Sequence, residues 1–206
     1  MKKVILSLVL ISTFTFTNAQ KTKIGAKVGL NLANANITGE SVPSMSSVAN
    51  LHVGGFAEFN ISKKVSFQPE LLYSMQGSKF SQAVVLNQTV YNTNNTFKLS
   101  YINVPLMFKY YPQEKFYFEV GPQIGFLTSS KLEVEVSNYG TNTQDAKELF
   151  ESLDFGLNFG LGYNFTKRIT SNVRYNFGLT NIAKTESGDD TTINNRVFSV
   201  SLGYIF

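Results

Sequence analysis

The stretch RVFSVSLGYIF, residues 196–206, alternates strictly between two kinds of side chain. One series is large and apolar: Phe198, Val200, Leu202, Tyr204 and Phe206. The intervening series is mostly small: Val197, Ser199, Ser201, Gly203 and Ile205. A period of two residues is typical of a β-strand, whose successive side chains point to opposite faces. An open edge strand with such an apolar row would pair with other chains, so the stretch predicts a sheet that closes into a barrel.

Seven further segments of the chain show the same alternation. They are residues 23–32, 50–60, 65–75, 97–110, 116–126, 153–165 and 169–180. The connections between the eight segments are long and short in turn, beginning with the long residues 33–49 and the short residues 61–64. We therefore predict an all-β fold, an eight-stranded antiparallel up-and-down transmembrane β-barrel with both termini and all short turns at one rim.

Three further features of the sequence give local predictions. Partial alternation within residues 77–96 predicts a hairpin that stands above the barrel. Asp145 and Glu148 have the spacing of a capping box, so we expect a short surface helix in the third long loop. Pro105 removes a hydrogen-bond donor from its strand, which predicts a bulge or a special local pairing there.

The N-terminal residues have the features of a secretory signal peptide. Two lysines precede an apolar run, and Ala19 is a small residue ahead of a cleavage site. We expect residues 1–19 to be the cleaved signal peptide and residues 20–206 to form one outer-membrane barrel domain. The apolar run is shorter than the roughly 20 residues that a spanning helix needs, so we expect no transmembrane helix.

The composition limits the other classes of protein and site. The chain has no cysteine, which excludes lipoprotein attachment, disulfides and thiolate metal sites. Aromatic residues make up 14% of the chain and charged residues only 16%, against about 25% charged in soluble domains. Something other than water is therefore expected to cover much of the surface. The net charge of +4 includes the two signal-peptide lysines, and 4 − 2 leaves +2, so we expect no nucleic-acid partner.

Alternation alone leaves two orientations open, an apolar interior in a soluble barrel or an apolar exterior in lipid. The polar face of the last three strands is almost entirely Gly, Asn, Ser and Thr rather than the Lys and Glu of a water-facing sheet. Small residues suit the crowded interior of an eight-stranded barrel. Tyrosines stand near the strand ends of the apolar face, where interfacial girdles lie, at Tyr73, Tyr110, Tyr163, Tyr175 and Tyr204. We therefore expect the apolar face to meet lipid.

Four motifs carry a resemblance to a known family. They are YINVPLMFKYY (residues 101–111), FEVGPQIGFL (118–127), DFGLNFGLGYNF (154–165) and VRYNFGLTNI (173–182). They resemble the small outer-membrane barrels common in Bacteroidetes, the PorT-like or "porin family" barrels. The resemblance implies a cell-envelope protein of the outer membrane with both termini in the periplasm. A final Phe206 with Tyr204 two residues before it is similar to the signal that the barrel-assembly machinery recognises in this class of protein.

Charged residues on the expected inner face are the candidate functional residues. They are Lys27, Glu58, Glu70, Lys109, Glu119, Asp154 and Arg174, with His52 beside them. Unpaired charge is costly to bury, so we expect a structural salt-bridge network that fills the lumen, with Arg174 facing Glu70 and Glu119 near mid-height. The alternative is a gated polar pathway or an acid/base site.

Catalytic and metal motifs are weak. A triad could be drawn from His52 and Asp154, but no nucleophile has a recognisable context because GxSxG is absent. No spacing of histidine and carboxylates predicts a catalytic residue, a metal site or a bound cofactor. Acidic residues of the loops could hold a divalent ion that bridges lipopolysaccharide, although solvated loop charge is the better account of them.

Three functions follow from this reading. The first is a non-enzymatic integral outer-membrane barrel with a side-chain-filled lumen and four extracellular loops for structural or binding roles. The second is a transport or secretion component, either a narrow pore or a PorT-like accessory of a secretion machine. The third is a membrane-embedded hydrolase. The expected partners are outer-membrane lipid or lipopolysaccharide, the barrel-assembly machinery and a loop-bound protein of unknown identity.

Overall fold

The computed structural model describes residues 22–39, 45–86, 89–136, 140–184 and 191–206. The signal peptide expected at residues 1–19 lies outside these ranges. The elements in order are β1 (Lys23–Thr38), β2 (Ser46–Asn60), β3 (Val65–Leu86), β4 (Thr89–Tyr110), β5 (Phe116–Val136), β6 (Gly140–Asp145), the 3₁₀ helix η1 (Lys147–Leu149), β7 (Leu153–Asn164), β8 (Ile169–Gly178) and β9 (Thr192–Ile205).

Eight of the strands close into a ring. The sheet runs in the order β4-β3-β2-β1-β9-β8-β7-β5-β6, and an additional pairing of β4 with β5 closes it. The first and last strands pair along their length, from Gly25 opposite Ile205 to Thr38 opposite Thr192. The predicted antiparallel up-and-down barrel is therefore confirmed, and its final strand has no free edge.

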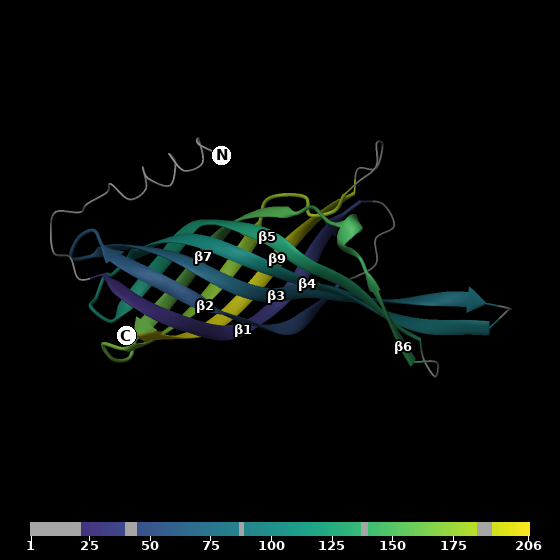
Figure 1. Cartoon of the computed structure of the whole chain (residues 1–206), viewed down its shortest axis with the longest axis horizontal. Helices are drawn as coiled ribbons and strands as arrows, with labels where there is room; N and C mark the ends of the chain where they lie inside the picture. The colour runs from purple at the N-terminus through teal and green to yellow at the C-terminus, as the bar shows by residue number, and fades with distance from the viewer. Residues whose placement is uncertain (1–21, 40–44, 87–88, 137–139, 185–190) are drawn as a thin grey trace, which may run out of the picture.

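The ring has two unlike ends (Figure 1). We call the end with the three short connections and the chain's C-terminus the turn end, and the opposite end the loop end. At the loop end β3 and β4 continue far beyond the ring as a hairpin, as expected, and remain paired to Leu86 opposite Thr89. Among the described strands, the one that is not part of the ring is β6. It lies beyond the loop end, where it pairs with the extension of β5.

Strands at the loop end are longer than the alternation predicts. β1 continues to Thr38 and β5 to Val136, through segments expected to be loops. Beyond the apolar band the outward-facing residues are polar, like the inward-facing ones. The strands therefore continue without the alternation of apolar and polar residues from which the sequence predicts their ends. The surface helix expected near Asp145 is a single 3₁₀ turn, in which a carboxylate oxygen of Asp145 accepts a hydrogen bond from the Lys147 backbone N–H.

The two faces of the ring are chemically opposite. Large apolar side chains of the alternating series are exposed on the outside, and the five expected girdle tyrosines are among them at 40–48% exposure. The inside holds buried amides, hydroxyls and charges. This arrangement confirms that the apolar face points outward. No helix in the described ranges is long and apolar enough to cross a membrane.

The β3–β4 ladder is interrupted at Pro105, as the missing donor predicts. Its paired positions pass from Pro69 opposite Leu106 directly to Leu72 opposite Asn103, with no change of register. The β4–β5 ladder is interrupted next to it, between Pro105 opposite Gln123 and Phe108 opposite Val120, and the bulge in this second ladder lies elsewhere, between Ser100 and Tyr101. Close to the interruption, a Cβ atom built on Gly121 would lie 2.0 Å from the Leu106 carbonyl oxygen. The two strands can approach this closely only because residue 121 has no side chain.

Substituting Gly121 by alanine should therefore destabilise the barrel by about 1–3 kcal/mol, the usual range for overpacking. Urea or thermal unfolding of the purified protein in detergent would measure the loss. Gly55→Ala is the matched control, since a Cβ at Gly55 comes no closer than 3.5 Å to any atom. Equal unfolding midpoints for the two variants would contradict the argument from close approach.

Candidate functional site

The lumen contains the candidate site, because alternation turns one charged residue of most strands inward. The seven inward charges are Lys27, Glu58, Glu70, Lys109, Glu119, Asp154 and Arg174, and each is no more than 6% exposed. Buried charges need partners, so the geometry of their contacts decides what they can do.

Arg174 is the centre of the larger group. Its Nη1 and Nη2 atoms donate to the two carboxylate oxygens of Glu70 at 3.0 and 2.9 Å, and its Nε donates to Glu119 at 2.8 Å. The Nζ of Lys27 donates to Glu70 at 2.8 Å. These four side chains come from β1, β3, β5 and β8, so the group crosses the lumen from wall to wall.

Lys109 is the centre of a second group, nearer the turn end. Its Nζ donates to Glu58 at 3.0 Å and lies 4.3 Å from the centre of the Tyr117 ring. Glu58 also accepts from the Nζ of Lys23 at 2.7 Å and from the hydroxyl of Tyr111 at 3.0 Å. Tyr111 follows the end of β4, and burial raises the pKa of its hydroxyl, which keeps it a donor.

Neutral amides join the two groups and add further hydrogen bonds. Gln68 donates to Glu70 at 2.6 Å and accepts from Lys109, and Asn172 donates to Glu119 at 2.7 Å. The six interior charges balance, because the three cations Lys27, Lys109 and Arg174 face three carboxylates. The carboxylates are Glu58, Glu70 and Glu119. Among the described residues the second oxygen of Glu119 has no hydrogen-bond partner. The six interior charges are therefore paired with one another across the lumen and buried, at 5% exposure or less.

Asp154 lies apart from both groups, toward the loop end. Its carboxylate accepts from the Asn195 amide at 2.8 Å and from the Thr180 hydroxyl at 3.1 Å. In the described ranges no Lys or Arg forms an ion pair with it. The sequence places Asp154 among the interior charges, whereas the structure connects it only to neutral side chains.

His52 has two partners that resemble part of a hydrolase site. Its Nε2 lies 2.9 Å from Ser201 Oγ, and its Nδ1 lies 2.8 Å from Asn31 Oδ1. A serine, a histidine and an amide in this order can activate a nucleophile. Asp154, which the sequence offered as the third member, is not a partner of His52. All three side chains are buried, at 4% exposure or less.

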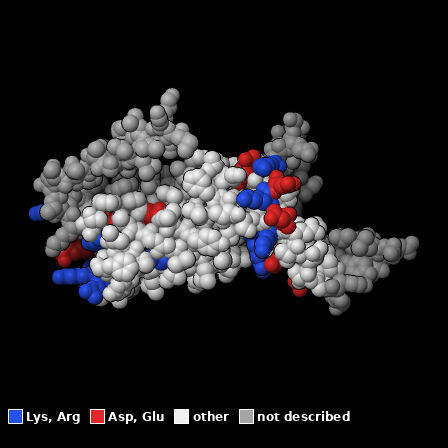
Figure 2. Space-filling model, viewed as in Figure 1, with Lys and Arg blue, Asp and Glu red and all other residues white. Residues whose placement is uncertain are grey.

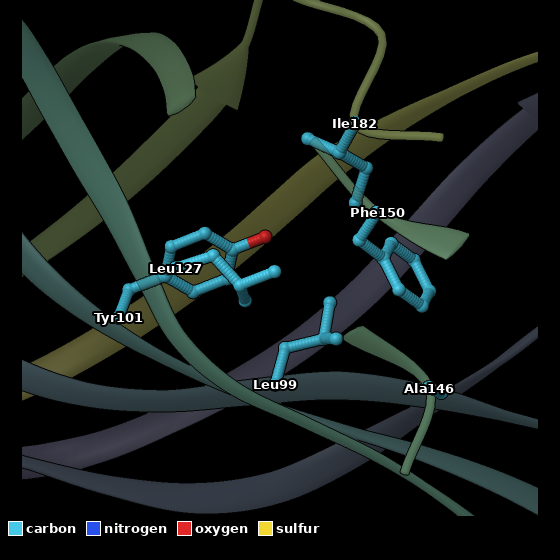
Figure 3. Packing of buried hydrophobic residues seen from close by; sticks show 6 residues of the cluster. All are labelled: Leu99, Tyr101, Leu127, Ala146, Phe150 and Ile182. Atoms are coloured by element: carbon cyan, nitrogen blue, oxygen red, sulfur yellow. The ribbon is translucent and has the colours of Figure 1, made fainter. Parts of the chain in front are cut away.

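The loop end of the lumen is closed by an apolar plug that the sequence reading missed. The plug residues are Leu99, Tyr101, Leu127, Ala146, Phe150 and Ile182. Figure 3 shows Phe150 and Ile182 descending from two different loop segments toward side chains of β4 and β5. Apolar packing therefore seals the mouth above the polar interior. The only signal in the sequence is that Phe150 and Ile182 are large apolar residues in otherwise polar loops.

Backbone hydrogen bonds tie the two plug segments to each other. The N–H of Glu151 donates to the Ile182 carbonyl at 2.8 Å, and the N–H of Lys184 donates to the Leu149 carbonyl at 3.0 Å. Phe150 and Ala183 form an isolated antiparallel bridge. The plug is therefore a connected structure across the mouth rather than two separate side chains.

A small cavity lies between the plug and the ion pairs. It has a volume of about 30 Å³ and is lined by polar side chains that include His52, Ser201 and Arg174. This volume accommodates about two water molecules. At the turn end an open recess of about 560 Å³ is lined by residues that include Lys23, Tyr111 and Glu114. No group of three or more His, Cys, Asp or Glu side chains in the described ranges has the geometry of a metal site.

Comparison with known proteins gives the family. Residues 18–184 match the family described as outer membrane protein beta-barrel domain, which covers most of the chain. The chain belongs to this family. It is therefore an integral outer membrane β-barrel, and its exposed apolar band is the surface that faces lipid. Figure 2 shows charged side chains gathered toward the two ends, with a largely uncharged band between them on the face in view.

Solved structures of several outer membrane proteins are similar to this chain. Ail, the attachment invasion locus protein of Yersinia pestis, is 11% identical with a TM-score of 0.44, over 90% of this chain and 99% of that one. OprG from Pseudomonas aeruginosa is 13% identical with a TM-score of 0.42, over 91% and 97%. Outer membrane protein W of E. coli is 15% identical with a TM-score of 0.40, over 92% and 100%. None of these similarities bears on function. No curated protein sequence matches the chain.

Proposed function

We propose that this outer membrane protein is a non-enzymatic barrel, closed to solutes, whose loop end presents a binding or structural surface. The observation that carries the proposal is the closure of the lumen at two levels. The apolar plug seals the mouth, and the network around Arg174 crosses the lumen below it. The space left between them holds about two water molecules.

The buried position of His52 argues against hydrolysis. A hydrolase needs a substrate carbonyl within about 3 Å of both its nucleophile and its oxyanion donors. Ser201 is 3% exposed and adjoins a cavity of about 30 Å³, too small for a substrate. The hydrogen bonds of His52 to Ser201 and Asn31 instead satisfy polar groups that would be costly to bury alone.

The proposal includes an orientation. The turn end with both termini faces the periplasm and the loop end faces outward, as short turns and long loops are arranged in barrels of this class. The apolar band contacts outer-membrane lipid or lipopolysaccharide, and the assembly machinery recognises Tyr204 and Phe206. The finer assignment to the PorT-like branch, as an accessory of a secretion machine, is supported by the motif resemblance alone.

Conductance in a planar lipid bilayer tests the closed lumen. We expect the purified, folded protein to give no reproducible current steps, because the plug and the ion pairs of the described residues both lie across the lumen. An open porin in the same bilayer is the positive control. Reproducible ion steps would overturn the closed barrel and favour the narrow-pore alternative.

A protein partner at the loops requires a separate experiment. Crosslinking in cells from positions in the β3–β4 hairpin, followed by mass spectrometry, would identify neighbours of the loop end. Crosslinks to components of a secretion machine would support the PorT-like role. Positions on the apolar band, such as Leu202, serve as the control because they face lipid.

A further inference from the structure

An amphipathic groove crosses the outer face of the barrel at its loop-end border. It has a volume of about 350 Å³ and lies over β1, β2, β8 and β9. Its lining residues are Leu32, Asn34, Ala35, Asn36, Ser47, Tyr175, Arg196 and Phe198. A volume of this size lies within the range of ligand sites in proteins.

Two rows of side chains, one above the other, give the groove its polarity. In the upper row Asn34 stands directly opposite Arg196 on the neighbouring strand. In the lower row Phe198 stands opposite Leu32 on one side and Tyr175 on the other. The lower row belongs to the exposed apolar band, at 40–50% exposure. The groove therefore spans the point where the outer face changes from polar to apolar.

Arg196 is held in place but keeps part of its guanidinium free. Its Nη1 donates to the carbonyl oxygens of Gly178 and Asn195 at 2.7 and 3.0 Å, and its Cζ lies 3.6 Å from the centre of the Phe177 ring. Among the described residues it forms no ion pair. Asp154, on the inner face of the sheet, interacts with this charge only beyond ion-pair distance. The remaining N–H groups have no acceptor among the described residues, so they are available to a ligand.

We propose that this groove binds one membrane lipid through its phosphate. The fixed guanidinium fork of Arg196 binds the phosphate, since Arg suits planar, multi-dentate contact with phosphate oxygens. The side-chain amide of Asn34, which stands opposite Arg196 on the neighbouring strand, donates a hydrogen bond to the headgroup. An acyl chain lies along Leu32, Phe198 and Tyr175. The proposal rests on the membrane location that the family shows, and it is independent of whether the lumen is closed.

Native mass spectrometry of the purified protein in detergent tests this site with three probes. They are a phosphatidylglycerol, an uncharged diacylglycerol with the same chains, and glycerol phosphate without chains. The site requires both phosphate and chain, so wild type should retain the phosphatidylglycerol and neither of the others. Arg196→Gln should weaken retention about tenfold, as expected for loss of a charge-assisted hydrogen bond.

Lys98→Gln is the matched control, because Lys98 is also an outward-facing cation at the loop end but is already paired with Glu133. It removes the same charge and should leave retention unchanged. Equal losses in the two variants would show attraction by net charge alone and overturn the site. Two results with the wild-type protein would also overturn the site: retention of the diacylglycerol equal to that of the phosphatidylglycerol, or binding of glycerol phosphate. This comparison of probes does not depend on the folding of any variant. Migration on unheated gels checks that both variants are folded.

Discussion

Replacing Arg174 by alanine is expected to lower the free energy of unfolding of the barrel by about 3–5 kcal/mol, the usual cost of breaking a buried ion pair. The substitution removes three hydrogen bonds to two carboxylates, Glu70 and Glu119. Glu70 would retain Lys27, but Glu119 would be left with one neutral donor, Asn172. The measurement is the loss of heat-resistant migration in detergent together with urea unfolding in lipid vesicles.

Two further variants show whether the effect comes from uncompensated charge. Lys98→Ala breaks an exposed ion pair and should cost less than about 1 kcal/mol. Arg174→Met combined with Glu70→Gln and Glu119→Gln removes the charges together and should recover much of the loss, since replacing a buried ion cluster by neutral groups is often nearly neutral. If Arg174→Ala unfolded at the wild-type midpoint, the structural role of the network would be wrong.

Deleting Phe206 is expected to prevent most of the protein from assembling in the outer membrane of cells. Phe206 is 78% exposed, and its ring packs on Tyr204 with the ring centroids 5.8 Å apart. Its backbone N–H donates one hydrogen bond, to the Ile24 carbonyl at 2.9 Å. An exposed terminal ring is accessible to an assembly factor. The measurement is the amount of folded protein in the outer-membrane fraction.

The same deletion should leave the purified protein nearly as stable as wild type. One lost hydrogen bond costs about 0.5–1.5 kcal/mol, so refolding in detergent should still succeed. Phe165→Ala is the matched control, because Phe165 is another exposed turn-end ring that packs on a tyrosine, Tyr163. It should assemble normally. Normal assembly of the Phe206 deletion, or equal failure of both variants, would refute a recognition role.

The sequence predicts the barrel fold, but its alternation does not predict how the interior charges pair. Alternation in residues 196–206 predicts a strand, an outward apolar face and closure, because strand geometry turns successive side chains to opposite sides whatever their neighbours. The same rule identifies which charged residues point inward. It does not identify their partners. Arg174 and Glu70 are 104 positions apart, and their meeting depends on the register of every strand between them.

The plug and the outer groove show the same limit. Phe150 and Ile182 lie in segments without periodicity, and only the backbone hydrogen bonds between those segments bring them over the mouth. In the sequence Arg196 is one polar residue at the start of a predicted strand, and only the register places it opposite Asn34 and over Phe177. The partners of His52 are likewise absent from any motif.

The sequence by itself therefore determined the barrel, its outward apolar face and the set of buried charges, since these follow from steric alternation within single strands. Only the tertiary structure decided that the charges form a balanced network around Arg174, that an apolar plug covers the mouth and that a groove with a partly free guanidinium lies at the border of the apolar band. Each of these depends on distances between residues far apart in the chain, which register and loop packing set.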